Sequence, residues 1–167
     1  MLFNELMSLK SDRSENIDIQ ELELYLPETP KEVLEQFYRD HGRKSEFQLQ
    51  YKDIDISLLR WDLIDISFNN MRNISIFHNF QKWVEICCLK SSKVLIENNW
   101  NMIGHTPETN RYWEKNSTWM RAPIMLKRKA TLHLVEGHSR YGCLKGLVNS
   151  GAISPDSLHS IWLATMP

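Results

Sequence analysis

The strongest structural signal in the chain lies in residues 131–151, which read TLHLVEGHSRYGCLKGLVNSG. The first five residues are mostly apolar and predict a buried strand. A glycine turn follows at Gly137, and Gly151 is a natural helix terminator. Between these two glycines, apolar residues recur at helical spacing (Tyr141, Leu144, Leu147 and Val148). The segment therefore predicts a strand, a tight turn and a helix in succession.

The turn between this strand and this helix is a candidate anion site. Ser139 is expected to be the N-cap of the helix, where free N–H groups and the helix dipole attract negative charge. Arg140 in the first turn opposes that dipole, so it calls for a negative partner. Two interpretations remain open. Either Arg140 binds a phosphate or carboxylate ligand, or it clasps Glu136 or the backbone and holds the turn.

The residues before this segment add a second strand. Residues 123–126 read PIML and predict a short apolar strand, with a basic connection at residues 127–129. A proline–isoleucine strand, then a strand ending in a G-x-x-R turn that opens a helix, resembles the core of the ParB/sulfiredoxin-like superfamily. The resemblance spans residues 123–151 and implies an α+β fold, in which a small mixed sheet packs with helices. It also implies that the turn grips nucleotide phosphates through Gly137, His138, Ser139 and Arg140.

The turn departs from that family at His138. Sulfiredoxin has its reactive cysteine at this position, and ParB-type members often have an acidic residue there, for which Glu136 is the nearest substitute. Sulfiredoxin chemistry is not expected, because the nearest thiol, Cys143, lies one turn into the helix and is expected to face the core. The chain also leaves no room for the helix-turn-helix and dimerisation tail of a partition protein. The fold can therefore be shared without the activity.

The N-terminal half is expected to contribute a helix and strands to a single domain, residues 1–167. A helix is predicted from Pro30 to Gly42, with a capping box formed by Thr29 and Glu32. Alternation of apolar and polar residues then predicts strands in residues 47–58 and 64–68.

The middle of the chain is expected to return to helix. Apolar residues at helical spacing predict a helix over residues 76–90 and a second short helix over 92–100. Residues 101–121 are polar and rich in tryptophan, and they are expected to form an irregular loop. Anchoring of this loop to the body is the favoured role for its tryptophans.

Charge is divided unevenly along the chain. Residues 1–66 carry fifteen acidic and eight basic side chains, a net charge of −7, whereas the remainder carries +6. The acidic part is taken as residues 1–70 and the basic, ParB-like part as residues 71–167. An acidic surface with aromatic anchors suits a protein that neutralises a basic toxin such as a nuclease, as small bacterial immunity proteins and antitoxins do. The candidate partner contacts are Glu15, Glu21, Glu23, Glu28, Trp113 and Trp119.

The alternative is a nucleotide- or phosphate-binding enzyme, with phosphohydrolase or NTPase activity. In this hypothesis the catalytic residues are Glu136, His138 and Arg140, with Glu136 as a base or as a ligand for Mg²⁺ beside a nucleotide. A nucleophilic pair of Cys143 and His138 is a weaker candidate. The neutraliser hypothesis, by contrast, needs no catalytic residue and no cofactor, and the spacing of the six histidines predicts no metal site.

Composition excludes several classes of protein. A net charge of −1 and a pI near 6.6 are unlike a protein that coats nucleic acid non-specifically. No apolar run reaches the length of a membrane span, and the first ten residues do not resemble a secretory signal. Three cysteines cannot form a disulfide framework. The sequence therefore predicts a reduced, cytoplasmic protein without membrane contact.

Overall fold

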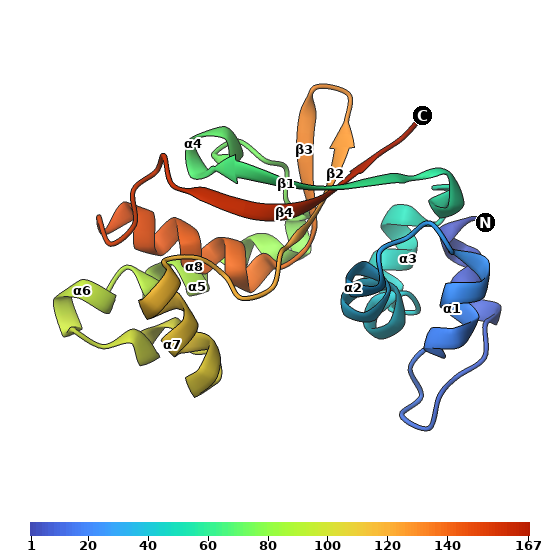
Figure 1. The fold of residues 1–167 in the computed structure, drawn as a ribbon, viewed down its shortest axis with the longest axis horizontal. Helices are drawn as coiled ribbons and strands as arrows, with labels where there is room; N and C mark the ends of the chain where they lie inside the picture. The colour runs from blue at the N-terminus through green and yellow to red at the C-terminus, as the bar shows by residue number, and fades with distance from the viewer. The chain divides into compact units, whose positions relative to one another are not determined.

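The computed structural model describes residues 1–167, and the chain forms two compact units (Figure 1). Unit 1 comprises Met1–Asp62 and Ala164–Pro167, and unit 2 comprises Leu63–Leu163. Unit 1 carries fourteen acidic and eight basic side chains, a net charge of −6, whereas unit 2 carries seven acidic and twelve basic, a net charge of +5. The charge division of the sequence thus follows the division of the fold. The single domain stays a prediction.

Unit 1 consists of short helical segments around an aromatic core. The ring of Phe37 lies centrally, with its centroid 5.7 Å from that of Phe3 and 5.3 Å from that of Phe47, and Tyr38 and Tyr51 complete the cluster. Aromatic rings at these separations attract one another beyond the gain from burial alone. The segments are η1 (Phe3–Ser8), α1 (Ile19–Tyr25), α2 (Lys31–Val33), η2 (Leu34–Arg39), α3 (Ser45–Tyr51) and η3 (Ile56–Leu58).

The helix predicted after Pro30 is confirmed, but its cap is not. The structure has α2 followed by η2, which is wound as a π-helix and buries Leu34 and Phe37. Pro30 itself is the N-cap, and no side chain caps the helix. The predicted capping box at Thr29 is wrong, because the side chain of Thr29 is buried instead.

The strands predicted in residues 47–58 are also wrong. Phe47 and Tyr51 are buried one helical turn apart on α3, whereas Leu49 between them is 80% exposed. A strand would place all three on one face. The alternation of apolar residues indicated a strand, although the segment is a helix in which only two of these residues are buried. The following apolar residues form η3, where Ile56 is buried and Asp55 accepts a hydrogen bond from the backbone N–H of Ser57.

Unit 2 contains a small mixed sheet packed with helices, which confirms the predicted α+β class. The strand order is β1-β4-β2-β3, and β2 and β3 form an antiparallel hairpin (Figure 1). Its longest helix, α5, has fourteen residues, and no helix in the structure is both long and apolar enough to cross a bilayer. The strands are β1 (Arg60–Ser67), β2 (Ile124–Arg128), β3 (Thr131–Glu136) and β4 (Leu158–Thr165). The helical segments are α4 (Phe68–Met71), α5 (His78–Ser91), α6 (Val94–Glu97), η4 (Trp100–Ile103), α7 (Pro107–Asn116) and α8 (His138–Asn149).

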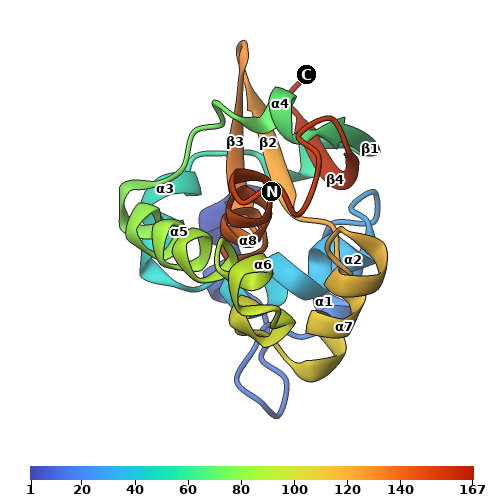
Figure 2. The same cartoon turned by 90° about the vertical axis from the view of Figure 1, so that its left-hand side faces the viewer.

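Helices α5 and α8 pack against each other at very close range (Figure 2). A Cβ atom added at Gly142 would lie 2.6 Å from the carbonyl oxygen of Val84, and one at Gly146 would lie 2.3 Å from that of Cys88. Both distances are below van der Waals contact, so each position accommodates only glycine. Two glycines four residues apart on one face of α8 therefore let its backbone rest on α5.

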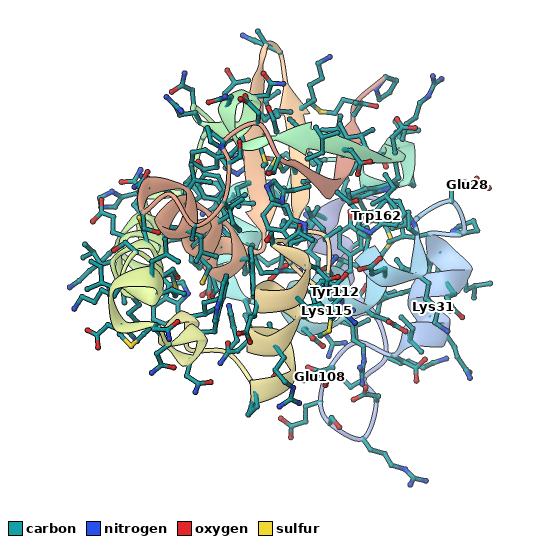
Figure 3. All side chains as sticks on the ribbon, turned by 60° about the vertical axis from the view of Figure 1, so that its left-hand side comes forward. Glu28, Lys31, Glu108, Tyr112, Lys115 and Trp162 are labelled. Carbon is teal, nitrogen blue, oxygen red and sulfur yellow. The ribbon has the colours of Figure 1, made fainter.

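Residues 101–121 are not the irregular loop that was predicted. The segment contains η4 and α7, and Thr106 caps α7 by accepting a hydrogen bond from the backbone N–H of Thr109. The exposed side of α7 carries Glu108 and Lys115 (Figure 3). Its inner side carries Trp113, which is fully buried and meets the edge of the Trp119 ring. The predicted anchoring role of these tryptophans is confirmed.

Candidate functional site

The turn at Gly137 has the predicted course. β3 ends at Glu136, Gly137 adopts a left-handed φ of 97°, and α8 begins at His138. Only glycine fits here, because a Cβ atom would lie 2.7 Å from the Cβ of Pro123 and because this φ is unfavourable for other residues. The N-cap is Gly137 rather than the predicted Ser139.

Arg140 forms an internal clasp. Its guanidinium makes an ion pair with Glu136, one turn back, and donates a hydrogen bond of 2.8 Å to the carbonyl oxygen of Arg121. A longer contact of 3.5 Å reaches the carbonyl of Ala122. The side chain of Arg140 is 15% exposed and that of Glu136 is 20% exposed. The cation thus ties the end of β3 and the start of α8 to the chain leading into β2. This is the clasp on Glu136 and the backbone that was the alternative to a bound ligand.

The other two residues of the turn contact helix α5. The ring of His138 is buried and stacks on that of Phe80, with centroids 4.2 Å apart. The hydroxyl of Ser139 accepts a hydrogen bond of 2.7 Å from the indole N–H of Trp83. Gly137, His138, Ser139 and Arg140 therefore all make packing or hydrogen-bonding contacts within unit 2.

The thiols of unit 2 do not form the predicted pair with His138. The sulfur of Cys143 lies 3.7 Å from Nε2 of His105 instead, and Cys143 is fully buried, as expected. A hydrogen bond with Cys87, together with burial, raises the pKa of the Cys143 thiol. Burial also lowers the pKa of His105, so this pair is held neutral and does not supply an activated nucleophile. No group of three or more metal-ligating side chains is positioned to hold a metal ion.

The acidic residues of unit 1 form a different kind of surface. Glu23, on α1, and Glu28, just after it, are both exposed. Glu28 is labelled in Figure 3. Leu24 and Tyr25 lie between them in the sequence and are 71% and 52% exposed. We call these four residues the acidic edge. Large apolar side chains surrounded by charge on a free surface are typical of protein-binding sites.

A hollow adjoins this edge. It has a volume of about 410 Å³ and is bordered by Tyr25 and Glu21. Lys10 reaches Glu21 from outside, with its ammonium 2.9 Å from the carboxylate. Glu21 is therefore already paired within the chain, whereas Lys10 itself is exposed. The full lining is Met1, Glu5, Ser8, Leu9, Glu21 and Tyr25.

The predicted partner contacts are only partly accessible. Glu15, like Glu23 and Glu28, is exposed, and Glu21 is half-buried against Lys10. Trp113 and Trp119 are not available to a partner, because both rings lie in the core of unit 2. The indole N–H of Trp119 donates a hydrogen bond to the carbonyl of Ser160, which fixes the ring inside.

Comparison of the chain with protein-family models, with curated proteins and with solved structures gives no match. Sequence reasoning missed Leu24 and Tyr25, the apolar residues of the acidic edge. Their exposure follows from the fold rather than from a sequence pattern, since both fall in a short helix whose only buried residue is Leu22.

Proposed function

We propose that the protein is a non-catalytic binding protein that neutralises a basic toxin, such as a nuclease, through the acidic edge. The observation that carries this proposal is the combination of Leu24 and Tyr25, both exposed, with Glu23 and Glu28 on a unit whose net charge is −6. The two apolar side chains supply contact area, and the carboxylates supply attraction to a basic surface.

The charges of the edge favour fast capture of a cationic partner. Glu28 makes no ion pair within the chain, and the ion pair of Glu23 with Lys31, at 3.7 Å, joins two exposed side chains. Such a surface pair contributes little to stability, so a partner can replace Lys31 at little cost. Opposite fields then raise the association rate by one to three orders of magnitude at low salt.

The contacts of Arg140 support a scaffold role for the G-x-x-R turn. An arginine that clasps Glu136 and the carbonyl of Arg121 stabilises the turn without a ligand. A ParB-like core would then be an inherited support, with binding located on unit 1. No specific contact in the structure favours a nucleotide at this turn over the clasp.

The test is co-expression with candidate toxins, beginning with those products of neighbouring genes that have a positive net charge. We expect growth rescue and a complex that survives purification, measured together with association rates at low and high salt. Glu23→Lys with Glu28→Lys should slow association about tenfold at low salt. The matched control is Glu108→Lys with Glu114→Lys, which reverses two exposed carboxylates on α7.

Two outcomes would contradict the proposal. One is an association rate equal in the edge variant and in the control variant. The other is a thermal shift with CTP or ATP in the absence of any protein partner, which would favour the nucleotide-binding enzyme. Circular dichroism of each variant shows whether the substituted chains remain folded.

A further inference from the structure

Unit 2 has an exposed surface with the opposite charge to the acidic edge. Leu89 and Lys90 lie near the end of α5, Lys93 lies in the turn that follows, and Leu95 and Ile96 lie on α6. All five are exposed, Leu89 at 66% and Ile96 at 84%. We call them the basic ridge. Of its elements, α5 packs against α8 (Figure 2).

The charges of the basic ridge are free. Neither Lys90 nor Lys93 makes an ion pair within the chain, although Glu97 lies four residues from Lys93. The ridge belongs to a unit whose net charge is +5. Exposed leucine and isoleucine side chains beside unpaired lysines suit a partner surface that is both apolar and acidic.

The acidic edge has that composition. It presents Leu24 and Tyr25 between Glu23 and Glu28, so apolar side chains and charges match those of the ridge in kind and in sign. The apolar side chains of each surface are exposed on their own unit, and therefore each surface can meet one from another molecule. A second copy of the chain carries an acidic edge for the basic ridge and a basic ridge for the acidic edge, so it can bind at both surfaces.

We propose that the protein associates head-to-tail with further copies of itself, the acidic edge of one copy binding the basic ridge of the next. Because the two surfaces differ, the contact is heterologous, and association continues with concentration or closes into a ring. Self-association uses the same edge as toxin capture, so the two compete. It does not depend on the toxin and is tested without one.

The test is a charge-swap experiment followed by sedimentation equilibrium over a concentration series. The wild type should exceed the 19.8 kDa monomer mass at low salt and approach that mass at high salt. Glu23→Lys with Glu28→Lys should weaken association at least tenfold, and so should Lys90→Glu with Lys93→Glu, since each variant opposes like charges. An equimolar mixture of the two variants should associate again, because the reversed edge of one matches the reversed ridge of the other.

A separate substitution tests the apolar part of the contact. Ile96→Asp alters a side chain that is 84% exposed, so the fold should persist while association falls. The control, Glu108→Lys with Glu114→Lys, should leave the mass distribution unchanged. A wild type that stays at monomer mass throughout would overturn the inference, as would a mixture of the two charge variants that fails to associate. If the protein rescues cells from the toxin but stays monomeric at every concentration, the self-association is overturned while the proposed function stands.

Discussion

At the scale of single residues, the G-x-x-R turn shows what sequence reasoning can and cannot resolve. The position of Gly137 between a strand and a helix is predictable, because its neighbours have strong and different periodicities. The role of Arg140 is not, since a clasp and a ligand site require the same cation beside the same carboxylate. The contact that distinguishes them is the hydrogen bond to the carbonyl of Arg121, nineteen residues away.

Replacement of the clasp should destabilise unit 2. Arg140→Ala removes the partner of a carboxylate that is only 20% exposed and the donor to the Arg121 carbonyl. We expect a loss of about 2–4 kcal/mol in the free energy of unfolding, measured with urea. Arg140→Lys should recover part of this loss, because the ammonium still pairs with Glu136. Equal stability of the alanine variant and the wild type would show that the clasp contributes nothing.

Two buried histidines should make stability depend on pH. Burial lowers the pKa of His133 to about 4, with a smaller contribution from Arg128, and burial lowers that of His159 to about 4. In the unfolded chain both titrate near 6.5, so that state takes up protons first as the pH falls. The contribution of these two histidines to the free energy of unfolding is therefore expected to be largest above pH 6.5, to decline toward pH 4 and then to level off.

The histidine variants test the source of that decline. His133 and His159 each meet a hydroxyl through Nδ1, from Ser75 at 2.7 Å and from Thr118 at 2.8 Å. In the double variant His133→Gln, His159→Gln, urea midpoints measured between pH 7 and pH 4 should change less than in the wild type. If the urea midpoint of the double variant changes with pH as much as that of the wild type, other groups cause the pH dependence.

At the scale of elements, prediction succeeded where periodicity and burial agree. β2, β3 and α8 were predicted because their apolar residues are buried or half-buried. α3 was mistaken for a strand because Leu49 is apolar yet 80% exposed, which completed a false alternation. α7 was missed because its inner face consists of only Asn110 and Trp113, although its start at Thr106 and Pro107 carries an ordinary helix-start pattern.

The glycine contact between α5 and α8 should not tolerate a methyl group. Alanine is ordinarily the better helix former by about 1 kcal/mol. At Gly142 or Gly146, however, the new Cβ would press on a backbone carbonyl of α5, which cannot rotate away. We expect Gly142→Ala and Gly146→Ala each to lower the free energy of unfolding by about 1–3 kcal/mol. Asn149→Ala, at an exposed position of α8, is the control. It removes only a long contact of 3.7 Å to the sulfur of Cys88 and should leave stability nearly unchanged.

At the scale of the whole molecule, the two units differ in chain continuity. Unit 2 is one uninterrupted stretch, whereas unit 1 has its main part before that stretch and its last residues, Ala164–Pro167, after it. The apolar residues that form the core of unit 2 all lie within residues 63–163, and only the outer ends of β1 and β4 extend beyond that range. Unit 2 therefore contains the contacts that a separate folding unit requires.

A fragment of residues 60–165, which retains β1 and β4 in full, should fold alone. We expect helix and strand signals by circular dichroism and a single cooperative urea transition. The full chain should then show two transitions if the units unfold separately. A fragment with the spectrum of an unfolded chain would contradict this prediction and would favour the single domain.

The sheet topology has a consequence for protein engineering. β1 and β4 are neighbouring strands, they run in opposite directions in Figure 1, and Ser160 donates a hydrogen bond to Asp65 between them. The two ends of the segment from the start of β1 to the end of β4, residues 60–165, thus emerge about one strand spacing apart, roughly 5 Å. Such a segment can be transplanted into a surface hairpin of an unrelated host, or its native ends can be joined and new termini opened elsewhere, without stretching either backbone.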